Sequence, residues 1–288
     1  MKLIKDTELI LTDKKKIYHL NLSPDDIASD IIIVGDPDRV SQVSNFFDTI
    51  SVKVQHREFI THTGTYNNKR ISVLSTGIGT DNIDIVLNEL DALINIDFLT
   101  RTVKKIKKSL NIIRIGTSGS IQKDVKVDSF VMASHGLGFD GLAHFYKHKG
   151  ITNEEIANLF IKHSNWPQEL SQPYVVEASG DLLARFTEIK KGITATATGF
   201  YAPQGRELRV SSSINNLHAK LNSFSYNNTQ IVNFEMETSA LYFLSKLLGH
   251  NALTICAVIG NRITKKYSKD YTKTINVLIE KVLKRLTN

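Results

Sequence analysis

A short run of apolar, mostly β-branched residues that ends in a glycine recurs along the chain and constrains the fold most. The run "IIIVG" occupies 31–35, "ISVLSTGIG" occupies 71–79 and "NIIRIGTSG" occupies 111–119. Each run predicts a buried strand that stops at a tight turn. Further strand-like runs lie at 127–134, 192–200 and 253–260.

Stretches with helical periodicity separate these runs, at 81–95, 152–164, 234–249 and from about residue 270. Alternation of strands and helices predicts an α/β domain with a mostly parallel central sheet. No internal repeat or Pro/Gly-rich linker divides the 288 residues. We therefore expect one domain, 1–288, with 1–16 as a loosely ordered N-terminal extension.

The charge of the chain raises nucleic acid as a partner, because lysine and arginine exceed the acids by a net +7. Much of the excess lies in Lys14–Lys16 and in "RTVKKIKKSL" at 101–110. Lysine pairs alternate there with apolar residues at helical spacing, which predicts an amphipathic helix with a solvated basic face. No zinc-ligand spacing or RNA-binding aromatic signature supports a nucleic-acid partner, so the solvated face is favoured.

The cysteine content and the N-terminus bear on location. Cys256 is the single cysteine and cannot form an internal disulfide. The first twenty residues carry scattered charges instead of the apolar segment of a secretory signal. These features predict a reducing, cytoplasmic location.

Two of the glycine turns have an arginine close by. Arg39 follows Gly35 by four residues, and Arg114 lies just before Gly116 and Thr117. Glycine turns allow backbone N–H groups to face an anion, and a guanidinium suits phosphate oxygens. Neither G-x-x-x-x-G-K-[ST] nor G-x-G-x-x-G is present. Chain reversal alone would explain each turn, but the turns and arginines together predict an anion site.

Two other segments carry candidate ligands for a sugar and a flat ring. Glu235 and Glu237 stand at the start of a predicted helix, where they either complement the helix dipole or accept from ribose hydroxyls. In "TGFYAPQGREL", Phe200 and Tyr201 end a predicted strand and are followed by Gln204 and Arg206. An aromatic face, an amide and a guanidinium fit a heterocycle with carbonyls, although a polar surface turn is an equal alternative.

In this order the segments resemble the nucleoside phosphorylase family, and specifically its uridine phosphorylase branch. The resembling motifs span about 17–263 and are "HLNL", "VGDPDRV", "HREF", "STGIG", "RIGTSGSIQ", "FYAPQGR", "NFEMET" and "VIGNR". The resemblance implies an α/β, single-domain nucleoside phosphorylase-like fold with a central mixed, partly barrel-like β-sheet flanked by helices. It also implies a dimer-based assembly, usually a hexamer, in which each dimer shares two active sites.

The resemblance further implies a role for each matching residue. The implied phosphate ligands are Gly35, Arg39, Arg114, Thr117 and, from a neighbouring subunit, Arg57. On sequence alone, Arg57 would be read as a surface ion pair with Glu58. The implied nucleoside ligands are Met236, Glu237, Phe200, Gln204, Arg206, Arg262 and the neighbour's His19. The implied catalytic residues among them are Arg206, Gln204, Arg114 and Glu237.

Departures from the family pattern shape the expected substrate and ions. Purine-cleaving relatives end the "TICAV" strand with Ser-Asp, whereas Gly260-Asn261-Arg262 follows here, which favours a pyrimidine. No cofactor or metal is expected, since inorganic phosphate is a substrate. Bacterial relatives hold a potassium ion near the equivalent of Glu58, but Thr80-Asp81-Asn82 replaces their Gly-Pro-Ser, which argues against the ion. The connection 94–110 is longer than in compact bacterial enzymes.

The predicted reaction is reversible phosphorolysis of uridine to uracil and ribose 1-phosphate. Such cleavage passes through an oxocarbenium-like sugar, with phosphate as the nucleophile. Three alternatives remain at this point: a nucleosidase that uses water, a phosphorylase for a purine nucleoside, and a catalytically silent nucleoside- or RNA-binding protein.

Overall fold

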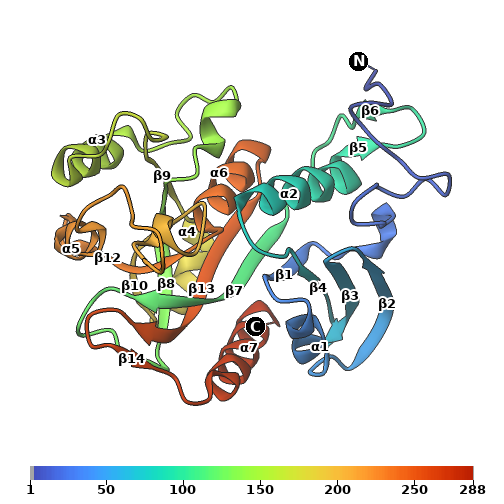
Figure 1. Cartoon of the computed structure of the whole chain (residues 1–288). Helices are drawn as coiled ribbons and strands as arrows, with labels where there is room; N and C mark the ends of the chain where they lie inside the picture. The colour runs from blue at the N-terminus through green and yellow to red at the C-terminus, as the bar shows by residue number, and fades with distance from the viewer. Residues whose placement is uncertain (1–2, 288) are drawn as a thin grey trace.

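One mixed β-sheet of twelve strands organises the computed structural model, in which residues 3–287 are described (Figure 1). Its strands are β1 (Asp30–Val34), β2 (Thr49–His56), β3 (Phe59–Tyr66), β4 (Lys69–Ser75), β7 (Asn111–Ser120), β8 (Phe130–Gly138), β9 (Tyr174–Glu177), β10 (Lys190–Thr196), β11 (Ser225–Tyr226), β12 (Thr229–Glu235), β13 (Asn251–Asn261) and β14 (Lys266–Tyr267). The strand-like runs predicted from sequence all fall within or across these strands. Their ends differ by a few residues.

Five of the strands close into a barrel. The order β7, β13, β8, β10, β12 returns to β7 through an antiparallel pairing of Asn233 with Ser120 and Phe234 with Gly119. The β13–β7, β8–β10 and β10–β12 pairs are parallel, whereas β13–β8 is antiparallel. The expected mixed, partly barrel-like sheet is therefore confirmed, and "mostly parallel" holds only for part of it.

The rest of the sheet extends from β7 as an open layer. β1 pairs in parallel with both β7 and β4, and β3 and β2 follow as antiparallel neighbours. All five residues of β1 are buried, as its continuous apolar run predicts for a central strand. β7 thus belongs to both the barrel and the open layer, which places the ends of β1, β4, β12 and β13 near one another.

Helices cover both faces of the sheet (Figure 1). They are α1 (Asp38–Ser44), α2 (Thr80–Asn95), α3 (Glu154–Ser164), α4 (Gly180–Leu183), α5 (Leu217–Ser223), α6 (Thr238–Leu248) and α7 (Tyr271–Thr287). α2 and α6 share one apolar cluster with Ile31 and Ile33, and α7 shares another with Ile32 and Val34. Alternate residues of β1 therefore pack against opposite helix layers, as strand geometry requires. No helix within residues 3–287 is long and apolar enough to cross a membrane.

The prediction of an amphipathic helix at 101–110 is wrong. The chain instead forms a small hairpin of β5 (Ile96–Asp97) and β6 (Thr102–Val103), and 104–110 has no helix. The backbone of Lys108 bonds to the side chain of Asn95 instead of making helical hydrogen bonds. The Asn95 amide accepts from Lys108 N and donates to Lys108 O. Ile106 is 84% exposed, so this apolar side chain does not pack against another element as the predicted helix would require.

Residues 3–16 of the predicted extension lie against this hairpin (Figure 1). The Arg101 guanidinium donates to the carbonyl oxygens of Ile4, Lys5 and Leu9, and Leu9 is buried. Part of the predicted extension is thus held against this hairpin, residues 1–2 lie outside the described part, and the loose order of 1–16 stays a prediction.

The observed ends of two strands place residues of the predicted site in other elements than the sequence predicts. β10 stops at Thr196, so Phe200 and Tyr201 lie in a loop instead of ending a strand. β12 runs to Glu235 and α6 begins at Thr238, so neither Glu235 nor Glu237 is inside the helix. Arg57 lies in the tight β2–β3 turn with a φ of 56°.

The start of α6 is fixed by a close approach to β8. A Cβ at Gly136 would come within 2.8 Å of Ser239 Cα and 3.0 Å of Ser239 N. We expect Gly136→Ala to lower the free energy of unfolding by about 1–3 kcal/mol, because the helix must move to accommodate the methyl group. Urea unfolding measures this change.

The matched control is Gly180→Ala, because a Cβ at Gly180 would meet no atom within 4 Å and this glycine opens helix α4. This variant should be neutral or more stable by up to about 1 kcal/mol, owing to helix propensity. Equal destabilisation by both substitutions would contradict the close-approach argument.

Candidate active site

A cleft of about 1040 Å³ opens where the strand ends of the barrel and the open layer meet. Contributions come from the turns after β1 and β4, from β7, from the loop after β10, from the β12–α6 junction and from β13. The lining residues predicted from the sequence are Gly35, Arg39, Arg114, Thr117, Phe200, Gln204, Arg206, Met236, Glu237 and Arg262. The fold therefore gathers residues more than 200 positions apart into one cavity.

Two arginines stand at one end of this cleft. Arg39 of α1 is buried, its Nη1 lies 3.4 Å from the Ile115 carbonyl oxygen, and Asp36 is 3.9 Å away. Burial lowers the pKa of Arg39, and the nearby positive charge of Arg114 lowers it further, while Asp36 opposes the shift. Two like charges held together out of water favour an anion between or beside them.

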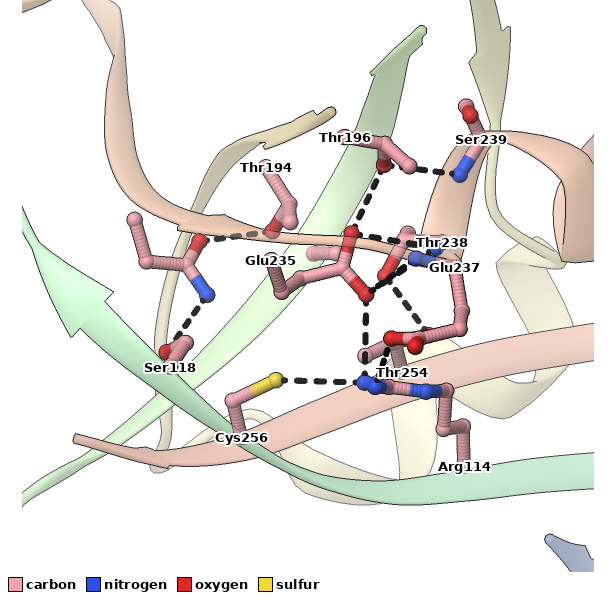
Figure 2. Close-up of polar contacts among 12 residues, drawn as sticks. Arg114, Ser118, Thr194, Thr196, Glu235, Glu237, Thr238, Ser239, Thr254 and Cys256 are labelled. Atoms are coloured by element: carbon pink, nitrogen blue, oxygen red, sulfur yellow. Dashed lines mark hydrogen bonds and ion pairs between the residues drawn. The ribbon is translucent and has the colours of Figure 1, made fainter. Parts of the chain in front are cut away.

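Arg114 is held by two carboxylates inside the barrel (Figure 2). Its Nη1 lies 3.2 Å from Glu235 Oε2, and its Nη2 donates to Glu237 Oε2. Burial alone would lower the pKa of Arg114, but Glu237 and then Glu235 outweigh it and raise that pKa. The guanidinium is therefore always charged, and its Nε has no hydrogen-bond partner within the described residues.

Glu235 and Glu237 have different hydrogen-bond partners. Glu235 accepts from Thr196 Oγ1 at 2.7 Å and from the backbone N–H groups of Glu237 and Thr238, so it caps the start of α6 (Figure 2). The helix-dipole interpretation thus applies to Glu235, although Glu235 ends a strand. Its oxygens are committed to the protein.

Glu237 faces the cleft with one oxygen bonded to the backbone N–H of Gly79 at 2.9 Å and the other to Arg114. Burial raises the pKa of Glu237, Arg114 opposes the rise, and Glu235 adds to it. An ionised carboxylate has about four lone-pair positions. Glu237 can therefore keep both protein contacts and still accept from ribose hydroxyls.

Gln204 marks the opposite end of the cleft. It is buried, and its Oε1 accepts from Arg206 Nη1 at 2.6 Å and from Arg262 Nη2 at 3.3 Å. Two guanidinium donors on one amide oxygen fix the orientation of the amide, so its NH₂ group is free to face a ligand.

Arg206 also covers the face of Phe200. Its Cζ lies 3.5 Å from the ring centroid, within the range of a cation–π contact. Burial and then the nearby Arg262 lower the pKa of Arg206 to about 10, so it stays protonated at neutral pH. Burial lowers the pKa of Arg262 as well. A ring entering this end would meet cations and an aromatic face.

Two predicted ligands lie outside the cleft. The Arg57 guanidinium stands 5.7 Å from the centroid of the Tyr18 ring, and that ring makes an edge contact with His19. His19 Nδ1 lies 2.7 Å from Glu89 Oε1 on α2. His19 and Arg57 therefore belong to one surface cluster, separate from the cleft of their own chain. No ion pair between Arg57 and Glu58 is found within the described residues, and Glu58 instead lines the cleft and accepts from Asn82.

Several residues that line the cleft had no role predicted from the sequence, namely Tyr271, Lys265, Lys266 and Tyr267. Lys265, Lys266 and Tyr267 lie between β13 and α7, and Tyr271 is the first residue of α7. This stretch shows no motif beyond "VIGNR". The continuation of that motif into a lysine pair was the only available signal. In the part of the chain that the structure describes, no group of three or more His, Cys, Asp or Glu side chains could hold a metal ion.

Asn261, which stands where an acid would serve a purine, is fully used by the protein. Its Nδ2 donates to the carbonyl oxygens of Gln122 and Val125, both at 2.8 Å. Its Oδ1 accepts from the backbone N–H groups of Ile263 and Thr264. The side chain therefore orders the turn that carries Arg262 and offers nothing to a ligand.

Asn261→Asp should consequently destabilise the protein and should not create a purine site. The carboxylate would lose both donated hydrogen bonds and face two carbonyl oxygens, at a cost of about 2–4 kcal/mol. Thermal and urea unfolding measure the loss, and inosine cleavage measures any new activity. Asn68→Asp, in the exposed β3–β4 turn, is the matched control and should change stability by at most about 0.5 kcal/mol. A stable Asn261→Asp protein that cleaves inosine would overturn this assignment.

Comparison with known proteins shows the family of the chain. The family model of the phosphorylase superfamily matches residues 30–287. A uridine phosphorylase of Thermococcus kodakarensis is 30% identical over 281 residues, which cover 96% of this chain and 88% of that one. A purine nucleoside phosphorylase of Clostridium novyi is 26% identical, covering 91% and 97%.

Among solved structures, a nucleoside phosphorylase of Trypanosoma brucei reported to show uridine phosphorylase activity superposes with a TM-score of 0.87 at 28% identity. The match covers 96% of this chain and 99% of that one. The chain therefore belongs to the phosphorylase superfamily and is a nucleoside phosphorylase, a pentosyltransferase.

Proposed function

We propose that the chain catalyses reversible phosphorolysis of uridine, giving uracil and ribose 1-phosphate. The observation that carries the choice of base is the end of the cleft formed by Gln204, Arg206 and Arg262. No carboxylate of the described residues is among the charges that act on the guanidiniums of Arg206 and Arg262. A pyrimidine with two carbonyl oxygens meets donors there, whereas a purine N7 that needs a protonated acid finds none. The uridine phosphorylases among the relatives support the same choice.

Phosphate would bind at the other end, between Arg39 and Arg114 with Thr117 and the turn at Gly35. A phosphate dianion would offset the repulsion between these two guanidiniums. Arg114 would then link phosphate to Glu237, because it already donates to that carboxylate. Glu237 and Met236 would hold the ribose, so that C1′ lies above a phosphate oxygen.

In the reaction, the bond from C1′ to the base nitrogen N1 would break as a phosphate oxygen bonds to C1′. The sugar would pass through an oxocarbenium-like state, which the adjacent phosphate charge stabilises. The electron pair of the broken bond would pass to the pyrimidine. Arg206 and Gln204 would donate to its carbonyl oxygens where that negative charge grows.

Binding of uracil would require one change in the base site. The N3–H group of uracil needs an acceptor, and Gln204 Oε1 is already shared by two guanidiniums. One of them must therefore release that oxygen, and Arg262 has the longer contact. Its release would leave Arg206 on the amide and free the second guanidinium for a base carbonyl.

His19 and Arg57 would act across a subunit contact. Both lie together on the surface, away from the cleft of their own chain. We propose a dimer-based assembly, as in a hexamer of three dimers, in which this cluster completes the phosphate and 5′-hydroxyl sites of a neighbour.

The decisive experiment incubates the protein with uridine, deoxyuridine, thymidine and inosine, each with and without inorganic phosphate, and quantifies free base. We expect phosphate-dependent release that is fastest for uridine. Base release without phosphate would indicate a nucleosidase. Faster cleavage of inosine would move the assignment to purines.

The role of Arg206 is tested by Arg206→Ala. Losing a donor aimed at the developing charge should lower kcat/KM for uridine by about 100-fold or more, with folding intact. Arg209→Ala is the matched control, because Arg209 lies exposed in the same loop and outside the cleft. Near-normal turnover by Arg206→Ala would refute the role.

A further inference from the structure

His218, which no family motif includes, supports the turn that carries Gln204. It is the second residue of α5, and its Nε2 lies 2.7 Å from the Gln204 carbonyl oxygen. The ring also lies close to Gly205, where a Cβ would come within 3.2 Å of Nε2. Gly205 has a φ of +64° and ends the short 3₁₀ turn Ala202–Gln204. One imidazole therefore fixes both the carbonyl and the backbone shape of the base-binding turn.

The protonation of the ring follows from its partners. A carbonyl oxygen only accepts, so Nε2 must carry the hydrogen in the neutral ring. Arg262 Nη1 lies 3.4 Å from the same nitrogen. Because both groups are donors, that contact cannot be a hydrogen bond, and the Arg262 guanidinium stays close to the ring through its contact with Gln204.

The surroundings of the ring are cationic. The charges that act on His218 are those of Arg262, Lys265 and Arg206, in decreasing order. Burial has the largest effect and lowers the pKa of His218, the hydrogen bond to Gln204 opposes this, and the three cations lower it further. No carboxylate is among the groups with the largest effects on the ring. Protonation would thus add a fourth positive charge beside Arg262, Lys265 and Arg206.

We propose that His218 is a positioning residue for the base site, and that its neutral form is what keeps the Arg206 and Arg262 guanidiniums together beside Gln204, where one stays on the amide and the other turns to a base carbonyl. This inference rests on the proposed function, since it assigns a second layer to the same base site. Protonation of the ring would repel both guanidiniums and spread the donors that a pyrimidine must meet. The affinity for the nucleoside should therefore fall as the pH falls through the pKa of His218.

The sign of the effect follows from that pKa. The ring is neutral at pH 7 because its pKa lies below the ordinary 6.5. The loss should therefore lie on the acid side, below pH 6.5. Phosphate also titrates in this region, so kcat/KM for uridine must be measured with phosphate dianion kept saturating at every pH.

The central variant is His218→Gln, compared with wild type from about pH 5 to about pH 8. Glutamine can donate to the Gln204 carbonyl oxygen but cannot titrate. We expect wild type to lose kcat/KM for uridine on the acid side and His218→Gln to stay flat. The matched control is His163→Gln, because exposed His163 also bonds to α5, through the Lys220 carbonyl oxygen and Ser223 Oγ, but lies outside the cleft. His163→Gln should lose kcat/KM for uridine on the acid side, as wild type does.

Two more variants separate the effect of charge near His218 from the effect of its hydrogen bond to Gln204. Lys265→Gln removes one cation that lowers the pKa of His218, so the acid loss should begin at a higher pH. His218→Leu removes the hydrogen bond and should raise the KM for uridine about fivefold at pH 7.5, while the KM for phosphate stays within about twofold. Thermal unfolding confirms that each variant is folded.

Retention of the acid loss in His218→Gln would overturn the inference, as would an equal rise in both KM values in folded His218→Leu. Neither result would touch the proposed reaction. A wild-type protein that releases no uracil at any pH would instead refute the proposed function itself.

Discussion

The contact between Arg114 and the two glutamates Glu235 and Glu237 is the interaction on which the site depends (Figure 2). It joins β7 to the junction of β12 and α6, where the barrel closes. Removing one member of such a buried ionic group typically costs about 3–5 kcal/mol, because the partner charge is left without compensation. The same guanidinium is placed where phosphate would bind, so closure of the barrel and assembly of the cleft are one event.

A polar interior surrounds this ionic group and explains its geometry. Thr194 donates to Asn233, and Asn233 donates to Ser118 across the barrel, while Thr196 donates to Glu235 and accepts from Ser239 N (Figure 2). Each of these buried groups is satisfied by another strand or by the start of α6. Such networks specify one arrangement, because any shift leaves a buried polar atom unpaired. Cys256 fits the pattern as a structural thiol, since burial raises its pKa to about 12 and makes it unreactive.

The two ends of the cleft are electrostatically different, and this division supports the proposed chemistry. At the proposed phosphate end, arginines alternate with carboxylates that hold them in place. At the proposed base end, guanidiniums are held by an amide oxygen and an aromatic face instead. Half-buried cations without a carboxylate partner carry a desolvation cost. That cost is offset when negative charge develops on a leaving group beside them, which is the transition state that phosphorolysis requires.

The strand runs and the long helices could be predicted from the sequence, because each depends on local pattern. Ten of the residues that line the cleft could be predicted as well, because they stand in short motifs at the strand ends. Val34 ends a continuous apolar strand, and Gly35 and Arg39 follow at fixed distances along the chain. The helix predicted at 101–110 failed because its spacing of apolar residues presumes a surface to pack on. Ile106 has none, and Asn95 binds the backbone of Lys108 instead. Likewise, Glu235 seemed to start a helix, but pairing of β12 with β10 extends the strand through it.

The sequence by itself determined which residue types stand at the strand ends, because short apolar runs and glycine turns act over a few neighbouring residues. Only the tertiary structure decided which of those ends meet. Closure of β12 onto β7 brings Glu237 to Arg114, and α5 brings His218 to Gln204. Both contacts join residues whose local sequences carry no sign of each other. They exist because a closed sheet leaves each side chain a single place in which its charge or hydrogen bond is satisfied.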